Sequence, residues 1–294
     1  MPFRATFDCL WCGRAWATRG PDDLEGWAQL CPDCLGRAGD NGFLRARLQG
    51  ALAERGRAAA AAAGGARSGA DELVAYYEAR AAEYDDWYLR RGRYSHGPAD
   101  DMAWRMELDQ ATQWLDGLPF EGRIVELAAG TGWWSPLLAA RGELWCYDAA
   151  AAPLDRARER LLAHGLRAHL HVRDAWATPE APPARGLFLG FWLSHVPRPR
   201  LGEFLALARG WLAPGGLLAC IDSRRDRASG AADQPWDEAT ETALRRLADG
   251  REFRIPKVYY EPSELATALA AAGFAEARVE TTARFFLLGR ATAS

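Results

Sequence analysis

The feature that most constrains the fold is a glycine-containing turn that follows a short apolar run. Residues 123–127 are Arg-Ile-Val-Glu-Leu, Gly130 and Gly132 follow, and the next residues suit a helix. Small side chains let a ligand approach the turn backbone, and the amides at the helix start would face that ligand. A second apolar run, 144–147, ends in Asp148, an acid suited to bind a ribose diol. This order predicts a strand, a tight turn and a helix that bind a nucleoside-containing cofactor.

The glycine spacing separates cofactor classes, although a turn that uses glycine only for its geometry is the alternative. A dinucleotide site has three spaced glycines around a pyrophosphate. Here Glu126 precedes the turn, where it would repel a pyrophosphate but suit a cationic or amino-bearing ligand. The pattern Glu126-x-Ala128-x-Gly130-x-Gly132 resembles motif I of class I S-adenosylmethionine (SAM) dependent methyltransferases. Ala128 stands where that family usually has its first glycine.

Strand-like and helix-like runs alternate after residue 123, which predicts right-handed crossovers and a parallel sheet. We expect strands over 123–127, 144–148, 168–172, 186–192 and 216–222, and helices over 134–140, 153–164 and 198–212. An antiparallel hairpin, 276–282 with 284–290, is expected to close the sheet. The resemblance covers about residues 71–294 and implies an α/β, Rossmann-like fold with helices on both faces of a mostly parallel sheet.

Further motifs carry the same resemblance and imply a set of cofactor contacts at the carboxyl ends of the strands. Asp174-Ala175-Trp176 follows the third strand, Phe191-Trp192 ends the fourth at the motif IV position, and residues 212–216 match Leu-x-Pro-Gly-Gly. The implied cofactor is SAM. Its expected contacts are Glu126, Ala128, Gly130, Gly132, Asp148, Asp174, Ala175, Trp176, Phe191, Trp192 and, from the preceding helix, Tyr76.

An aromatic helix is predicted over residues 71–91, where five Tyr and Trp residues recur at spacings near 3 and 4. The run Tyr76-Tyr77-x-x-Arg80-Ala81-x-x-Tyr84-Asp85 resembles the helix that covers the SAM site in many small-molecule methyltransferases. Simple packing against the main domain is the alternative, and one residue can serve both purposes. A second helix is expected over 101–115.

Methyl transfer from a sulfonium requires an acceptor held in line and, for a hydroxyl acceptor, a group that takes its proton. His195, just past the fourth strand, is the candidate base; the alternative is a histidine that only hydrogen-bonds the next loop. Tyr84 and Tyr88 are candidates for positioning the acceptor. The insertion 224–260 suits substrate selection, with a surface helix plus an edge strand as the alternative. Its candidate substrate residues are Trp236, Arg254, Lys257 and Tyr259.

The N-terminal segment carries two Cys-x-x-Cys pairs, which predict a structural zinc site because four thiolates complete a tetrahedron. Two disulfides or free thiols are the alternatives. Trp11, Trp16 and Trp27 are expected to form a small core around the metal, with stacking on RNA bases as the alternative. We therefore expect a zinc ribbon over 1–42, a helix and Ala/Gly-rich linker over 43–70, and a methyltransferase domain over 71–294, with 71–120 as a helical lid. The metal ligands are Cys9, Cys12, Cys31 and Cys34.

Charge and motif content bear on the partners. Net charge is −3, and residues 1–70 hold nine arginines against seven acids, so neither part has the basic excess typical of nucleic-acid binding. No apolar run suits a membrane span and no secretory leader is recognised, so a cytoplasmic location is expected. Three hypotheses remain: O- or N-methylation of a small molecule; an RNA methyltransferase that docks through the ribbon; and a non-catalytic SAM-binding regulatory or assembly protein whose ribbon contacts a protein partner.

Overall fold

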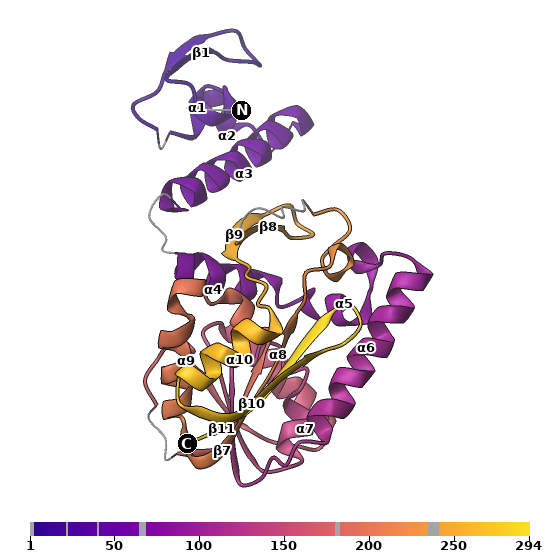
Figure 1. The fold of residues 1–294 in the computed structure, drawn as a ribbon. Helices are drawn as coiled ribbons and strands as arrows, with labels where there is room; N and C mark the ends of the chain where they lie inside the picture. Colours follow the sequence, from indigo (N-terminus) through magenta and orange to yellow (C-terminus); the bar gives the residue numbers. More distant parts are fainter. Residues whose placement is uncertain (1–2, 22, 40, 65–68, 180–182, 235–240) are drawn as a thin grey trace. The chain divides into compact units, whose positions relative to one another are not determined.

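The computed structural model describes residues 3–21, 23–39, 41–64, 69–179, 183–234 and 241–294 (Figure 1). The chain divides into two compact units, Met1–Ser68 and Gly69–Ser294. In the described ranges, no helix is both long enough and apolar enough to cross a membrane.

The N-terminal unit is a small hairpin and two short helices beside one long helix. Strand β1 (Thr6–Asp8) pairs antiparallel with β2 (Ala15–Ala17), and α1 (Leu24–Ala28), α2 (Pro32–Gly36) and α3 (Gly42–Gly64) follow. Within the expected helix and linker over 43–70, helix α3 extends to Gly64 and includes the alanine run; residues 65–68 lie outside the described residues. The buried core of this unit is Cys9, Ala28, Leu30, Cys31, Cys34, Ala38, Leu44 and Ala51.

The expected tryptophan core of this unit is wrong for two of its three members. Trp11 is 45% exposed and Trp16 is 37% exposed, while Trp27 is partly buried against the core. Trp11 stacks on Phe43 with ring centroids 5.6 Å apart. Because small residues and cysteines fill the interior, the larger rings lie outside it.

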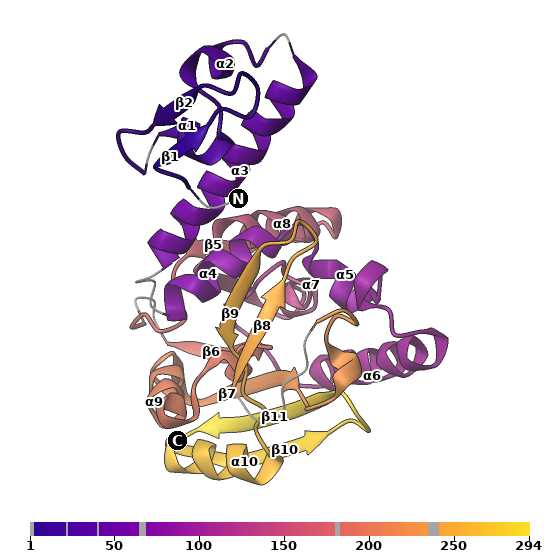
Figure 2. The ribbon, with the colours of Figure 1, turned by 90° about the horizontal axis from the view of Figure 1, so that it is seen from above.

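The second unit is built on a seven-stranded sheet with the order β10-β11-β7-β6-β3-β4-β5 (Figures 1 and 2). The pairs β3–β4, β4–β5, β3–β6 and β6–β7 are parallel, and β11 pairs antiparallel with both β7 and β10. This confirms the predicted mostly parallel sheet with a closing hairpin. The strands are β3 (Arg123–Leu127), β4 (Glu143–Asp148), β5 (His169–Val172), β6 (Ala184–Gly190), β7 (Leu212–Ser223), β10 (Phe274–Thr281) and β11 (Phe286–Ala293).

Alternate side chains along the central strands enter two separate cores, as expected for a sheet buried on both faces. Ile124 and Phe188 pack with α6 (Pro98–Asp116), α7 (Ser135–Ala139) and α8 (Ala151–Ala163). Val125 and Leu187 pack with α9 (Leu201–Gly210) and α10 (Pro262–Ala271). The carboxyl ends of β3 and β6, which lie at the point where strand order reverses, are therefore held from both sides.

The single aromatic helix expected over 71–91 is instead two helices. Helix α4 (Gly69–Arg80) ends in a turn at residues 81–83, and α5 (Tyr84–Leu89) follows. The Glu83 amide donates to the Arg80 carbonyl at 2.9 Å, a contact across three residues that tightens the chain and redirects it.

In its described residues, the insertion does not have the form of the alternative, a surface helix plus an edge strand. The described part of 224–260 contains no α-helix: it has the short 3₁₀ turn η4 (Arg227–Ser229) and an antiparallel pair, β8 (Thr242–Arg246) with β9 (Glu252–Pro256). This pair forms its own two-stranded sheet and is not an edge strand of the main one. Leu247 and Ile255 of this segment pack on Leu73 and Tyr76, so α4 lies against β9 (Figure 2).

Candidate functional site

The glycine turn after β3 adopts left-handed backbone conformations at three alternate positions. The φ angles are +54° at Ala128, +57° at Gly130 and +70° at Gly132. A Cβ on Gly132 would lie 2.7 Å from the Ala157 Cβ, so this glycine allows the turn to approach α8. A Cβ on Gly130 would meet nothing within 4 Å, so the backbone there faces open space, as a ligand cradle requires.

Asp148 at the end of β4 lies directly beside this turn. Its two oxygens accept hydrogen bonds from the backbone amides of Gly130 and Ala150, each at 2.8 Å. Burial raises the pKa of Asp148 to about 6, although the two amides oppose that shift. A carboxylate has about four acceptor sites, so two remain after these bonds for a diol.

Glu126 was expected among the cofactor contacts, and its side chain is turned into the protein. Only 2% of the residue is exposed, and its Oε2 accepts hydrogen bonds from the Ser135 hydroxyl at 2.6 Å and the Cys146 thiol at 3.5 Å. Burial raises the pKa of Glu126 to about 7. These contacts make Glu126 a support beneath the turn. Cys146 and Cys220 are fully buried.

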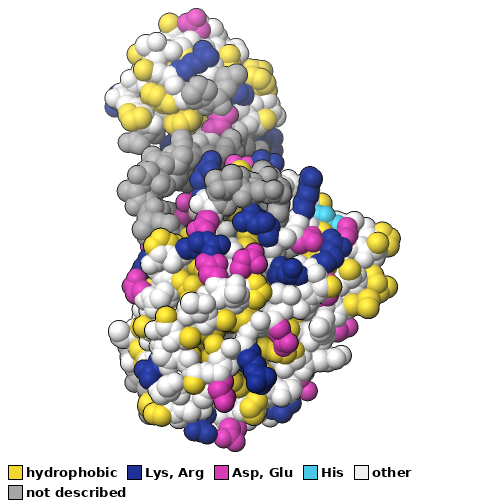
Figure 3. Space-filling model, in the orientation of Figure 1, with side chains coloured by type: hydrophobic (Ala, Val, Ile, Leu, Met, Phe, Trp, Pro, Cys, Tyr) yellow, Lys and Arg dark blue, Asp and Glu magenta, His cyan; other side chains and the backbone are white. Residues whose placement is uncertain are grey.

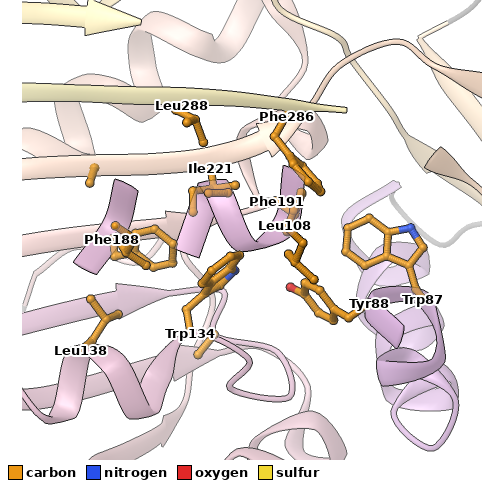
Figure 4. Packing of buried hydrophobic residues seen from close by; sticks show 14 of the residues in the cluster. Trp87, Tyr88, Leu108, Trp134, Leu138, Phe188, Phe191, Ile221, Phe286 and Leu288 are labelled. Carbon is orange, nitrogen blue, oxygen red and sulfur yellow. The ribbon is translucent and has the colours of Figure 1, made fainter. Parts of the chain in front are cut away.

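Helix α5 packs over the glycine turn through polar and aromatic contacts. The Thr131 hydroxyl donates to the Asp85 carboxylate at 2.7 Å, and Arg160 of α8 lies 2.5 Å from the other Asp85 oxygen. Tyr88 stacks on Trp133 with centroids 4.2 Å apart and planes 5° apart. The α5 side chains Trp87 and Tyr88 project toward Phe191 and Phe286, as Figure 4 shows. Tyr88 is therefore buried between the turn and the core.

The expected contacts after the third and fourth strands take different positions. Asp174 is exposed, and its side chain accepts the Trp176 amide at 2.8 Å, while Ala175 is buried. Phe191 is buried and has a φ of +55°, a strained conformation for a non-glycine residue at the end of β6. Trp192 is partly buried and packs near Phe204, at 5.9 Å between centroids.

A pocket bounded by α4, α5, η4 and the β8–β9 hairpin contains the predicted histidine. Tyr76, Tyr84 and His195 are among the residues that line it. The His195 Nδ1 lies 2.7 Å from the Pro256 carbonyl, which can only accept, so Nδ1 carries the proton. The Nε2 atom therefore accepts from the Tyr77 hydroxyl at 2.6 Å. Burial lowers the pKa of His195 to about 3, so the imidazole is neutral.

Lys257, the only lysine in the chain, faces the same pocket. Its Nζ donates to the hydroxyls of Ser194 at 2.9 Å and Ser223 at 3.1 Å. Burial lowers the pKa of Lys257 to about 8, against the opposing charge of Asp222. Asp222 accepts the Ser194 amide at 2.8 Å, which fixes the start of the His195 turn.

The other predicted substrate residues are scattered. Tyr259 lies beside Lys257, with Nζ 5.4 Å from the ring centroid, whereas the Arg254 side chain is exposed on β9. Trp236 lies outside the described residues. Several residues that the fold brings to this region were not among those predicted from the sequence, namely Tyr77, Asp85, Thr131, Arg160, Ser194, Asp222, Ser223 and Arg245. Only Tyr77 and Asp85 had a local signal, because they belong to the aromatic run.

The four N-terminal cysteines are gathered at one point. Their sulfur atoms all lie within 4.8 Å of one another, and the Cys12 and Cys31 sulfurs are 3.7 Å apart. A tetrahedral zinc with bonds of about 2.3 Å places its sulfurs about 3.8 Å apart. Gly13, with a φ of +71°, turns the chain after the first pair. The donor set and spacing therefore fit a four-thiolate metal site.

The central part of the second unit matches a known protein family. Residues 124–216 match a family model described as a methyltransferase domain. A search of curated proteins gives no match.

Solved structures with a similar fold match over most of this chain. The DhpI–SAM–HEP complex is 29% identical with a TM-score of 0.60, covering 77% of this chain and 98% of that chain. DhpI with SAH gives 29% identity and a TM-score of 0.58, covering 75% and 95%. Magnesium protoporphyrin IX methyltransferase (ChlM) from Synechocystis, with bound SAM, is 15% identical with a TM-score of 0.52, covering 78% and 99%. The last similarity concerns the fold alone.

Proposed function

We propose that this chain, which is a SAM-dependent methyltransferase, transfers the methyl group to an oxygen or nitrogen atom of a small-molecule acceptor. The observation that carries the proposal is the neighbouring position of two features: the glycine turn with Asp148, and the pocket that contains His195. Tyr84 links them, because it lines the pocket and its ring centroid lies 5.8 Å from that of Tyr88, which stacks on Trp133 just after the glycine turn. DhpI, whose complex contains SAM and HEP, supports a small acceptor.

The residues around the turn fit the cofactor. Asp148 would hold the ribose diol through its free acceptor sites, Gly130 would let the ligand approach the backbone, and Asp174 with Ala175 would contact the adenine. SAM, when bound, supplies a methyl group that is already activated on a sulfonium. The chain must then mainly position the acceptor and receive a proton.

Tyr77 and His195 are suited to take that proton in relay. An acceptor hydroxyl would pass its proton to the Tyr77 oxygen as the Tyr77 proton moves to the His195 Nε2 atom, which accepts from Tyr77 already. The Pro256 carbonyl keeps the other nitrogen protonated throughout. His195 thus acts as a base only through Tyr77. Because burial lowers its pKa to about 3, it is a weak base, and the proton would move to it only as the new bond to the methyl carbon forms and makes the acceptor O–H strongly acidic.

Titration of the protein with S-adenosylhomocysteine (SAH) by calorimetry tests the cofactor assignment. We expect saturable binding near one molecule per chain, and absence of binding to folded protein would contradict it. Formation of SAH from SAM in the presence of candidate acceptors then tests turnover. Binding without turnover on any acceptor would instead favour the regulatory or assembly alternative.

We further propose that the cysteine cluster binds one structural zinc ion. Four thiolates at tetrahedral spacing leave no position for a substrate, so the metal would stabilise a unit whose core holds few large side chains.

Exposed Trp11 and Trp16 keep RNA docking through this unit as a second candidate, because exposed rings can stack on bases. The charge distribution argues against RNA docking, because acidic and basic side chains are interspersed on the face of the second unit seen in Figure 3. An RNA affinity that falls steeply with salt would support docking.

A further inference from the structure

Arg80 is a buried cation in an aromatic surrounding. It is only 8% exposed, and its guanidinium carbon lies 4.4 Å from the Tyr84 ring centroid and 5.5 Å from those of Tyr76 and Tyr94. Its Nε atom has no hydrogen-bond partner among the described residues. Rings stabilise a guanidinium face, but they do not satisfy N–H donors in the guanidinium plane.

Two more cations line the same pocket. Arg245 of β8 donates to the Gln234 side chain at 2.9 Å, and Lys257 donates to two serine hydroxyls. Every one of these contacts is to a neutral group. The described residues that line the pocket include Arg80, Arg245 and Lys257 but no Asp or Glu.

Several other arginines of this unit are paired with carboxylates. Arg284 contacts Asp100 and Asp226, and Arg160 contacts Asp85. Acids outnumber bases in the chain, 39 to 36, so counter-ions are not scarce.

A cation taken out of water without a counter-ion is costly. Arg80 is such a buried cation, whereas Arg245 and Lys257 are half-buried and Asp222 offsets part of the Lys257 charge. The lining of the pocket is therefore net positive, and an anion would complete it.

We propose that this pocket binds an anionic group of the methyl acceptor, a carboxylate or phosphate-type oxyanion; this inference rests on the proposed methyltransferase function. Guanidinium forks match the geometry of two oxyanion oxygens, and the Lys257 ammonium adds a point charge. The Tyr77 hydroxyl lines the same space, so one acceptor molecule would present its anion to the cations and its reacting atom to Tyr77.

The carboxylate of the cofactor is the other source of the same chemistry. Arg80 lies over Tyr84, whose ring neighbours Tyr88 beside the glycine turn, and is the cation that such a carboxylate would reach. Arg245 lies within the insertion and Lys257 near its end, so the anionic group of the acceptor is the expected partner of these two side chains. Changes at Arg245 and Lys257 therefore separate the two sources.

The test uses full-length protein saturated with SAH and inorganic phosphate as the probe. Calorimetric titration should give saturable phosphate binding to the wild type, on the order of millimolar. Arg245→Gln and Lys257→Gln should each weaken it at least about tenfold. Arg246→Gln is the matched control, because its exposed side chain pairs with Glu252 on the same hairpin. SAH affinity should stay within about twofold in all three variants, which also shows that each is folded.

Three results would overturn the inference: no saturable phosphate binding by the SAH complex, an equal loss in Arg246→Gln, or a loss of SAH affinity in Arg245→Gln and Lys257→Gln. The last result would assign the cations to the cofactor carboxylate. A wild-type protein that fails to bind SAH would contradict the proposed function itself, and this outcome is read before phosphate is added.

Discussion

The Thr131 hydroxyl, inside the glycine turn, donates a 2.7 Å hydrogen bond to the carboxylate of Asp85 on α5. The second oxygen of Asp85 meets Arg160, whose Nε also donates to the Thr131 carbonyl at 3.1 Å. One acid therefore connects the helix that covers the site, the turn beneath it and α8. The position of α5 and the shape of the turn should therefore be coupled.

Asp85→Asn should weaken SAH binding about tenfold, because hydrogen bonds to a charged group contribute roughly 1.5–3 kcal/mol and these partners are partly exposed. Hydrogen exchange of the α5 amides should accelerate more than that of the sheet. Asp86→Asn is the control, since it makes the same change on the same helix. Equal effects of the two variants would show that α5 is not held through Asp85.

Asp148→Asn should reduce SAH affinity strongly while the sheet stays folded. The wild-type protein should lose SAH affinity as pH falls through about 6, because the protonated acid accepts fewer hydrogen bonds. The pKa is raised by burial, so this loss should begin at a higher pH than for an ordinary aspartate. Calorimetry across pH measures both effects. Asp155→Asn, on an exposed acid of α8, should behave as wild type.

The sequence predicted the sheet well because its signals are local. Residues 123–127 form an apolar run closed by a glycine turn, and β3 occupies the same five positions. The hairpin in the insertion could not be predicted, because a polar segment such as 242–256 becomes a strand pair through pairing and through contact with α4. The periodicity of the sequence gives no sign of either contact. The Tyr77–His195 bond likewise joins residues 118 positions apart, so only the tertiary fold brings them together.

Ala128→Gly should stabilise the second unit by about 0.5–1 kcal/mol. Ala128 has a φ of +54°, and a left-handed conformation strains a residue that has a Cβ. The neighbouring Ala129→Gly should have the opposite effect, because Ala129 does not have a positive φ, and glycine there adds unfolded-state entropy and removes a buried methyl group. Denaturant unfolding measures both changes, and stabilisation by neither variant or by both would contradict the strain argument.

Tyr77→Phe and His195→Gln should each lower kcat by roughly 100-fold or more on a hydroxyl acceptor, with smaller changes in KM. A proton relay predicts a loss mainly in kcat. A rise in KM alone would instead show that these residues only position the acceptor. Since the pKa of His195 is about 3, the wild-type rate should show no histidine titration between about pH 5 and 8. His169→Gln changes an exposed histidine of β5 and should leave the rate unaffected.

Metal analysis of the purified protein should find about one zinc per chain, and strong chelation should unfold the N-terminal unit. Three of the eight buried core residues there are cysteines, and the others are only alanine and leucine, so little apolar area remains to hold the unit without the metal. Cys12→Ser should lower the zinc content, whereas Cys220→Ala, a change at a cysteine buried in the second unit, should leave it at one. SAH binding should survive chelation, since Asp148 and the glycine turn belong to the other compact unit. A fully folded, metal-free N-terminal unit would exclude the zinc site.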